Sequence, residues 1–176
     1  HPTVVSAFHG METNRSHLGG WSCFGSGRNL DSWEPMSAFA VYPRTKWTAG
    51  MQRAVEEGAE FFLQRELHTQ GDRYEPWFRF HYPNHYYYDL LVGLRILTRL
   101  GYGADPRLAP ALTWLRRKRA PDGAWALDAA HPDLDATLAG FQYHEIMFPM
   151  ILEPLHEPSQ WATVEALSVL ARADAR

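Results

Sequence analysis

The chain has 176 residues, of which 45% are hydrophobic and 21% are charged, and its formal net charge is −3. This composition is typical of one globular domain with its own core, and it excludes an intrinsically disordered chain. The 17 basic residues do not outnumber the 20 acidic ones, so the charge balance gives no indication of a nucleic-acid partner. One cysteine, Cys23, excludes a disulfide within the chain.

The cellular setting is predicted from the same counts. A lone cysteine is typical of a reducing compartment, and no apolar run approaches the roughly 20 residues of a membrane-spanning helix. We therefore expect a cytoplasmic protein without a transmembrane segment. The chain begins with His1 rather than methionine, as a segment cut from a longer protein would.

The first third of the chain predicts an irregular start followed by two helices. Residues 1–31 contain five glycines and no sustained periodicity, so we expect an irregular lead-in. A short helix is predicted over 32–41, since proline is tolerated in a first turn. A longer helix is predicted over 45–67, where apolar residues recur at helical spacing. The segment 68–83 is predicted to be a loop.

The next two segments predict a hairpin of one buried and one more polar helix. Residues 86–100 carry leucines at i, i+4 and i+7 with few polar residues, so we expect burial on more than one side. Asp105 followed by Pro106 predicts the start of the second helix, which ends in the basic run 116–119. We interpret that run as cations at the negative end of a helix dipole.

The last part of the chain is less regular. A short helix is predicted from Pro132 to about residue 143, and the prolines that follow exclude a long one there. Ser159 is predicted to cap a final helix reaching about residue 173. We expect that helix to bury one face, made of Trp161, Val164, Leu167 and Ala171.

A turn that carries a tryptophan recurs between these helices. Its clearest copy is residues 121–125, Pro-Asp-Gly-Ala-Trp, with weaker echoes at 19–21 and 71–77. Asp-Gly supplies a tight turn, and the large indole ring is expected to dock on a neighbouring element. A return about every 50 residues predicts an all-α repeat of antiparallel helical hairpins in one domain, residues 1–176.

This pattern resembles the α/α-toroid superfamily of terpenoid cyclases and protein prenyltransferase β-subunits. The resemblance lies in the 121–125 turn, in residues 87–94 (Tyr-Tyr-Asp-Leu-Leu-Val-Gly-Leu) and in residues 158–163 (Pro-Ser-Gln-Trp-Ala-Thr). It covers about residues 18–172 and implies a partial toroid, because the chain supplies about three hairpins where a full ring has six. The glutamine that usually precedes the turn is absent.

The resemblance also implies a catalytic acid. Residues 133–137, Asp-Leu-Asp-Ala-Thr, are similar to the Asp-x-Asp-Asp-Thr motif of squalene-hopene-type cyclases, with Ala136 in place of one aspartate. In that family the middle acid protonates an alkene, and Asp135 matches its position. The alternative is that these aspartates cap a helix or lie on the surface.

Aromatic and histidine residues gather before the most apolar helix, and the resemblance places them at the mouth of a central cavity. We expect an apolar ligand of isoprenoid type to be held there by burial and cation–π attraction. The alternative is that the rings only pack the loop against helix ends. The candidate ligand-binding residues are Trp77, Phe80, His81, His85, Tyr86, Tyr87, Tyr88 and Asp89.

A metal or other cofactor is not expected. His81, His85 and Asp89 recur every four residues, but Pro83 interrupts a helix between the histidines. The zinc-binding Asp-x-Cys of prenyltransferases is also broken, because Trp21 stands two residues before Cys23.

Two other functions remain open, and so does the oligomeric state. A helical-repeat module that binds a protein partner is one alternative, and a carbohydrate-active toroid using carboxylates such as Asp89, Asp135 and Glu145 is the other. Because a half ring leaves apolar helix faces without a partner at its ends, we expect a homodimer or pairing with a further helical segment.

Overall fold

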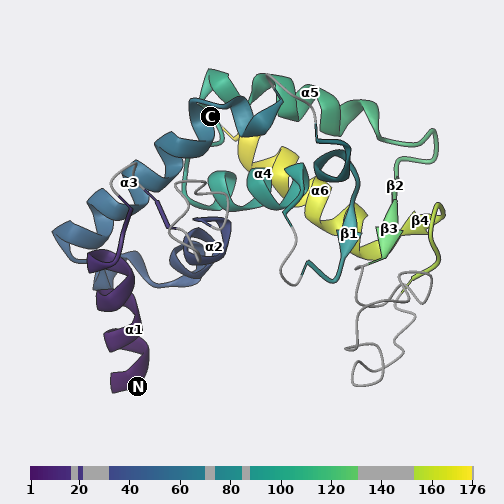
Figure 1. Cartoon of the computed structure of the whole chain (residues 1–176). Coiled ribbons are helices and arrows are strands. Elements are labelled where there is room, and N and C mark those ends of the chain that lie inside the picture. The colour runs from purple at the N-terminus through teal and green to yellow at the C-terminus, as the bar shows by residue number, and fades with distance from the viewer. Residues whose placement is uncertain (17–19, 22–31, 70–73, 85–87, 131–152, 176) are drawn as a thin grey trace.

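The computed structural model describes residues 1–16, 20–21, 32–69, 74–84, 88–130 and 153–175. Helices dominate these residues, which confirms the predicted all-α class (Figure 1). No helix in these ranges combines the length and the apolar character needed to cross a membrane.

The N-terminal part contains one helix more than predicted. Helix α1 covers Pro2–Thr13, within the segment expected to be irregular, so that prediction was wrong there. It begins with proline at its first position and buries Phe8, which stacks on Tyr42 with ring centroids 3.9 Å apart. Val4, Phe8 and Met11 stand at i, i+4 and i+7, so this helix does carry a short apolar stripe.

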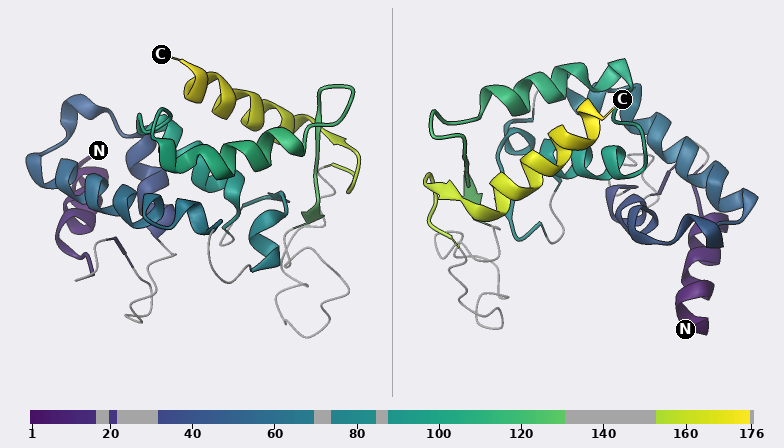
Figure 2. Two further views of the ribbon diagram at one scale, coloured as in Figure 1. Left: turned by 90° about the horizontal axis from the view of Figure 1, so that it is seen from above. Right: turned by 180° about the vertical axis from the view of Figure 1, so that it is seen from behind.

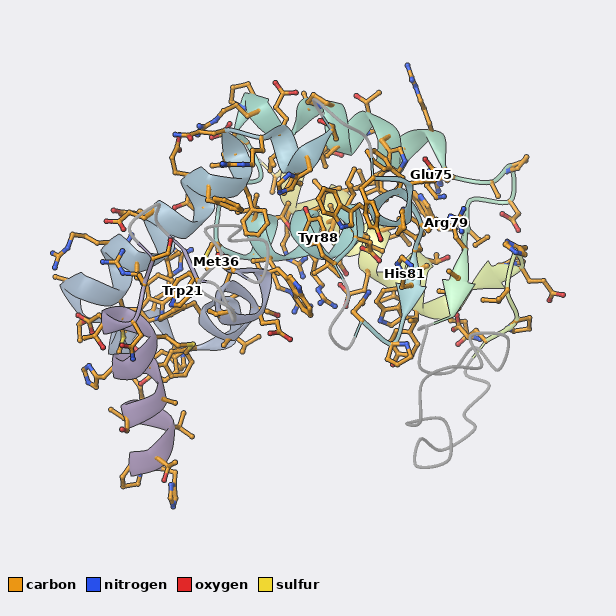
Figure 3. The ribbon with its side chains drawn as sticks, in the orientation of Figure 1. Trp21, Met36, Glu75, Arg79, His81 and Tyr88 are labelled. Carbon is orange, nitrogen blue, oxygen red and sulfur yellow. The ribbon has the colours of Figure 1, made fainter. Side chains whose placement is uncertain are left out.

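The next helices lie close to the predicted positions. Helix α2 covers Trp33–Val41, the 3₁₀ helix η2 covers Arg44–Lys46, and α3 covers Ala49–Leu63. Thr48 caps α3 by accepting a hydrogen bond from the Met51 amide. Gly58 lets α3 pack closely against Met36 of α2 and Trp21, since a Cβ there would lie 2.8 Å from the Met36 sulfur and 2.9 Å from the Trp21 ring (Figure 3).

In the second half, Asp105 and Ser159 mark helix starts as predicted, whereas the helix predicted from residue 86 begins at Leu90. Helix α4 covers Leu90–Arg99, the 3₁₀ helix η5 covers Pro106–Leu108, α5 covers Ala109–Arg117 and α6 covers Gln160–Asp174. Asp89 accepts a backbone N–H at the start of α4, Asp105 does so at η5, and Ser159 does so at α6. The 3₁₀ turns η3 and η4 cover Glu66–His68 and Glu75–Phe78.

The helices follow a regular contact order. Helix α4 packs between α2 and α6. Helix α3 packs on both α1 and α2, and α5 packs on α4. In Figure 1, α3 and α5 run along the upper edge and α2 and α4 lie below them. The views in Figure 2 show α6 beside α4, with its C-terminus near an outer edge of the molecule. Eight of the ten residues of α4 are buried, as its apolar sequence predicts.

The tryptophan turn makes the same pair of contacts at both ends of the chain. The indole N–H of Trp125 donates to the Leu115 carbonyl of α5, and that of Trp21 donates to the Met11 carbonyl of α1, both over 2.8 Å. The backbone N–H of Trp125 donates to Thr163 in the first turn of α6. That of Trp21 donates to Ser32, directly before α2. Each turn thereby joins one helix to the start of the next.

Helix α6 buries a different face from the predicted one. Ala162, Ala166 and Val169 are buried against the core, whereas Val164 and Leu167 are 61% and 45% exposed. The physical reason is close packing: small alanines let α6 approach α4, and the bulkier apolar residues are left on the outside. The prediction that Val164 and Leu167 face the core was therefore wrong.

Candidate functional site

Four short strands bring the starts of α4 and α6 together. Strand β1 (His81–Tyr82), ahead of α4, pairs in parallel with β3 (Ala129–Ala130). Strand β4 (Pro158–Ser159), ahead of α6, pairs antiparallel with β2 (Trp125–Ala126). Because β2 and β3 belong to one segment, 125–130, the chain after the tryptophan turn holds both helix starts in place (Figure 1).

A pair of aromatic rings lies at these helix starts. Tyr82 in β1 and Trp161 in the first turn of α6 have ring centroids 4.6 Å apart, and both side chains are partly exposed. We call Tyr82 and Trp161 the aromatic pair. Sequence reasoning placed Tyr82 near the candidate ligand residues but assigned Trp161 to a buried helix face. Only the strand pairing reveals their contact.

Asp89 is the polar anchor of this region. Its carboxylate is fully buried and accepts hydrogen bonds from the Val92 amide at 2.8 Å and the His81 amide at 3.1 Å. The Asn84 side-chain amide donates to the same carboxylate at 3.3 Å, and the His81 ring lies 3.7 Å from it. The carboxylate therefore ties the loop before α4 to the first turn of that helix.

The other described ligand candidates lie in two ring clusters. Trp77 is partly exposed and meets the edge of Tyr88, with centroids 5.9 Å apart. Phe80 is fully buried and meets the edge of Trp114 at 5.2 Å. His81 and Tyr88 are 5% and 4% exposed, and Figure 3 shows Tyr88 near the centre of the molecule with His81 beside β1. These contacts are those of rings packing loops against helix ends.

His68 packs with Trp77 and Tyr88, and we call these three rings the Tyr88 cluster. The sequence analysis did not single out His68 as a site residue. It follows Glu66 and Leu67, and the φ angles of the three residues are 47°, 54° and 62°. A left-handed backbone costs about 1–3 kcal/mol per residue away from glycine. Burial of Leu67 and the ring contacts of His68 with Trp77 and Tyr88 offset that cost.

The Tyr88 cluster holds two polar atoms that lack hydrogen-bond partners among the described residues. These are the Tyr88 hydroxyl and Nε2 of His68, both fully covered. Burial raises the pKa of Tyr88 well above its usual value, with a further contribution from the Asp89 charge. Gly93 makes room for the hydroxyl, because a Cβ at that position would lie 2.5 Å from it.

Stability should depend on pH through His68. Burial, and secondly Arg65, lowers the pKa of His68 from 6.5 to about 4. The unfolded chain then binds the proton more readily between these values, so the contribution of neutral His68 is complete above pH 6.5 and is lost toward pH 4. We expect His68→Gln to reduce the fall in unfolding free energy over this range, measured by urea unfolding.

The exposed His9 of α1 provides the control for this experiment. His9→Gln should leave in place the part of the pH dependence that burial of His68 causes. Identical slopes for the parent and for His68→Gln would contradict the assignment.

Several predicted site residues lie outside the described part of the chain. They are the catalytic candidate Asp135, the ligand candidates His85, Tyr86 and Tyr87, and also Cys23 and Glu145. Within the described ranges, no three or more His, Cys, Asp or Glu side chains gather in a way that could hold a metal ion. The spacing of His81, His85 and Asp89 is untested, since His85 is among the residues outside.

Comparisons of the chain with protein families, with curated proteins and with solved structures give no match.

Proposed function

We propose that this protein binds an apolar small molecule of isoprenoid type, with the aromatic pair of Tyr82 and Trp161 forming one end of the ligand site. The observation that carries this proposal is the position of the pair. Two partly exposed rings meet where two neighbouring helices begin, and paired strands hold both rings in place. Ring faces of this size bind apolar molecules by removing their surface from water.

The arrangement of the helices supports a toroid-like arc as the scaffold. Helices α2, α4 and α6 contact one another in order, and α3 and α5 follow α2 and α4 in the chain and pack on them. The repeated contact of Trp21 and Trp125 with the preceding helix supports successive copies of one hairpin. In this proposal the buried clusters around Tyr88 and Phe80 support the site, and Trp77 lies at its edge.

Acid-initiated cyclisation enters the proposal only through the family resemblance. Asp135, the residue that the resemblance assigns to proton transfer, lies outside the described residues. Asp89, a second carboxylate that the sequence singles out, is fully buried and accepts three hydrogen bonds, which suits an anchor better than a sugar-cleaving acid.

The ligand proposal is tested by calorimetric titration with farnesol, an isoprenoid alcohol. Trp161→Leu should weaken farnesol binding at least about tenfold, since one large aromatic contact is worth more than about 1.4 kcal/mol. Trp47→Leu is the matched control, because Trp47 is also partly buried but lies between η2 and α3. Equal farnesol affinity in the Trp161→Leu variant and the parent would refute the site.

A second candidate function is favoured by the outer face of α6. The exposure of Val164 and Leu167 on this terminal helix suits a docking surface, either for a protein partner or for a second copy of the chain. Native mass spectrometry separates the two functions. A dimer carrying extra mass of lipid size supports a ring completed by pairing around a ligand, whereas a bare monomer contradicts both the ligand and the dimer.

A further inference from the structure

Three arginines and one glutamate gather between α4 and α6, on the side of α6 that carries Trp161. Arg95 and Arg99 lie one turn apart on α4, and the Glu165 carboxylate of α6 lies 3.8 Å and 3.7 Å from their guanidinium groups. Arg172 lies two turns beyond Glu165 on α6. We call Arg95, Arg99, Glu165 and Arg172 the arginine cluster.

The cluster has an excess of positive charge. Arg95 and Arg99 lie close to the Glu165 carboxylate, and Arg172 interacts electrostatically with Arg99 and Glu165, so the cluster has a formal charge of +2. Burial lowers the pKa of Arg172, Arg99 lowers it further, and Glu165 opposes them. Burial and a neighbouring positive charge both disfavour the charged form of an arginine, and here they outweigh the attraction of Glu165. Nearby Asp174 does not relieve the excess, since its carboxylate pairs with Arg116 of α5 at 2.8 Å.

The hydrogen bonds of the cluster are also incomplete. The two Arg–Glu distances exceed the roughly 3.2 Å limit of a good hydrogen bond, so these charges attract without direct bonding. Nε of Arg95 and one terminal nitrogen of Arg172 are buried donors with no acceptor among the described residues, and one Glu165 oxygen lacks a donor. Each buried donor left in this way destabilises the folded state, because it has given up its hydrogen bond to water without a replacement.

From this geometry we infer that the arginine cluster is a binding site for an oxyanion, a phosphate or a carboxylate. Such a group offers several acceptor oxygens to guanidinium donors and supplies the missing negative charge. The anion enters past the Arg99 side chain, which is 34% exposed. Glu165 competes with the anion for the arginines, and a protonated phosphate oxygen could donate to its free oxygen.

The position of the arginine cluster also indicates what kind of ligand the aromatic pair would bind. This step rests on the proposed function. Trp161, Glu165 and Arg172 follow one another at i, i+4 and i+11, so they lie along one face of α6. At 1.5 Å per residue, Arg172 lies about 16 Å along the helix from the aromatic pair. A ligand that reaches both has an apolar body on the rings and an anionic head on the arginines.

The experiment measures binding of three probes to the full chain by calorimetry at fixed ionic strength: sodium pyrophosphate, dodecanoate and 1-dodecanol. Arg172→Gln should weaken pyrophosphate and dodecanoate binding about tenfold, as expected for one lost charge-assisted hydrogen bond, and leave dodecanol unchanged. Arg15→Gln, the same substitution at an arginine that pairs with Glu57 of α3, should leave all three probes unchanged. Comparing the two anions tells whether a phosphate or a carboxylate is preferred.

Glu165→Gln provides a change in the opposite direction. Removing the competing carboxylate should tighten pyrophosphate binding and increase the rise in melting temperature that pyrophosphate gives, even if the variant is less stable without the anion. Unchanged or weaker pyrophosphate binding in Glu165→Gln would overturn the anion site, as would equal affinity in Arg172→Gln and the parent.

The probes distinguish failure of this inference from failure of the proposed function. Dodecanol binding that is lost in Trp161→Leu, without any pyrophosphate binding, would retain the apolar site and refute the anion site. Pyrophosphate binding without dodecanol or farnesol binding would retain the arginine site and refute the apolar ligand.

Discussion

Trp125→Ala should lower the free energy of unfolding by about 3–5 kcal/mol, the range for removing a large buried aromatic side chain. Trp125 is fully buried, its indole donates to the Leu115 carbonyl, and its backbone N–H donates to Thr163. Alanine would leave a cavity between α5 and α6, and the Leu115 carbonyl would lose the indole N–H that it accepts. Denaturation by urea, followed by circular dichroism, measures the change.

Two milder variants identify the cause of that loss. Trp125→Phe keeps most of the apolar volume and should cost less, chiefly through the missing indole donor. Trp114→Phe makes the same replacement at a partly exposed ring of α5 that meets Phe80 edge-on, and should cost less still. If Trp125→Ala were no more destabilising than Trp114→Phe, the turn would not be the joint between hairpins that its contacts indicate.

Asp89→Ala should destabilise the protein by about 3–5 kcal/mol, combining the loss of a helix cap with buried donors left without an acceptor. The amides of Val92 and His81 and the side chain of Asn84 all donate to this fully buried carboxylate. Urea unfolding measures the effect. Because the carboxylate also fixes the loop that carries Tyr82, farnesol binding should weaken in the same variant.

Asp105 allows a matched control, since it caps η5 by accepting the Arg107 amide but remains partly exposed to water. Asp105→Ala should cost about 1 kcal/mol, the usual value for a solvated cap. Asp89→Asn retains one acceptor oxygen and should fall between the two. Similar losses for Asp89→Ala and Asp105→Ala would show that burial of Asp89 adds nothing.

Helix starts and chain turns were predictable because they depend on neighbouring residues. Ser159 and Asp105 with Pro106 mark the starts of α6 and η5, since a side-chain acceptor can satisfy amides only a few residues away. The cap of α4, Asp89, was not predicted, and that helix begins at Leu90 instead of residue 86. The docking of Trp125 was predictable too, because so large a ring after a tight turn has to be buried.

The faces and partners of those helices were decided by tertiary structure. Sequence periodicity gave α6 an apolar stripe through Val164 and Leu167, but packing on α4 selected the face of Ala162 and Ala166, whose small side chains allow close approach. Helix α1 depends on a contact of Phe8 with Tyr42, which no local pattern reveals.

The candidate site divides in the same way. The sequence alone identified the aromatic residues near α4 and Asp89 as candidates, since they stand together in a short stretch, but it did not identify Asp89 as the cap of that helix. The meeting of Tyr82 with Trp161 and of Arg95 with Glu165 joins residues about 70 or more positions apart. Such contacts exist only once strands β1 to β4 and helices α4 and α6 have paired, because local sequence fixes elements while the pairing of elements fixes sites.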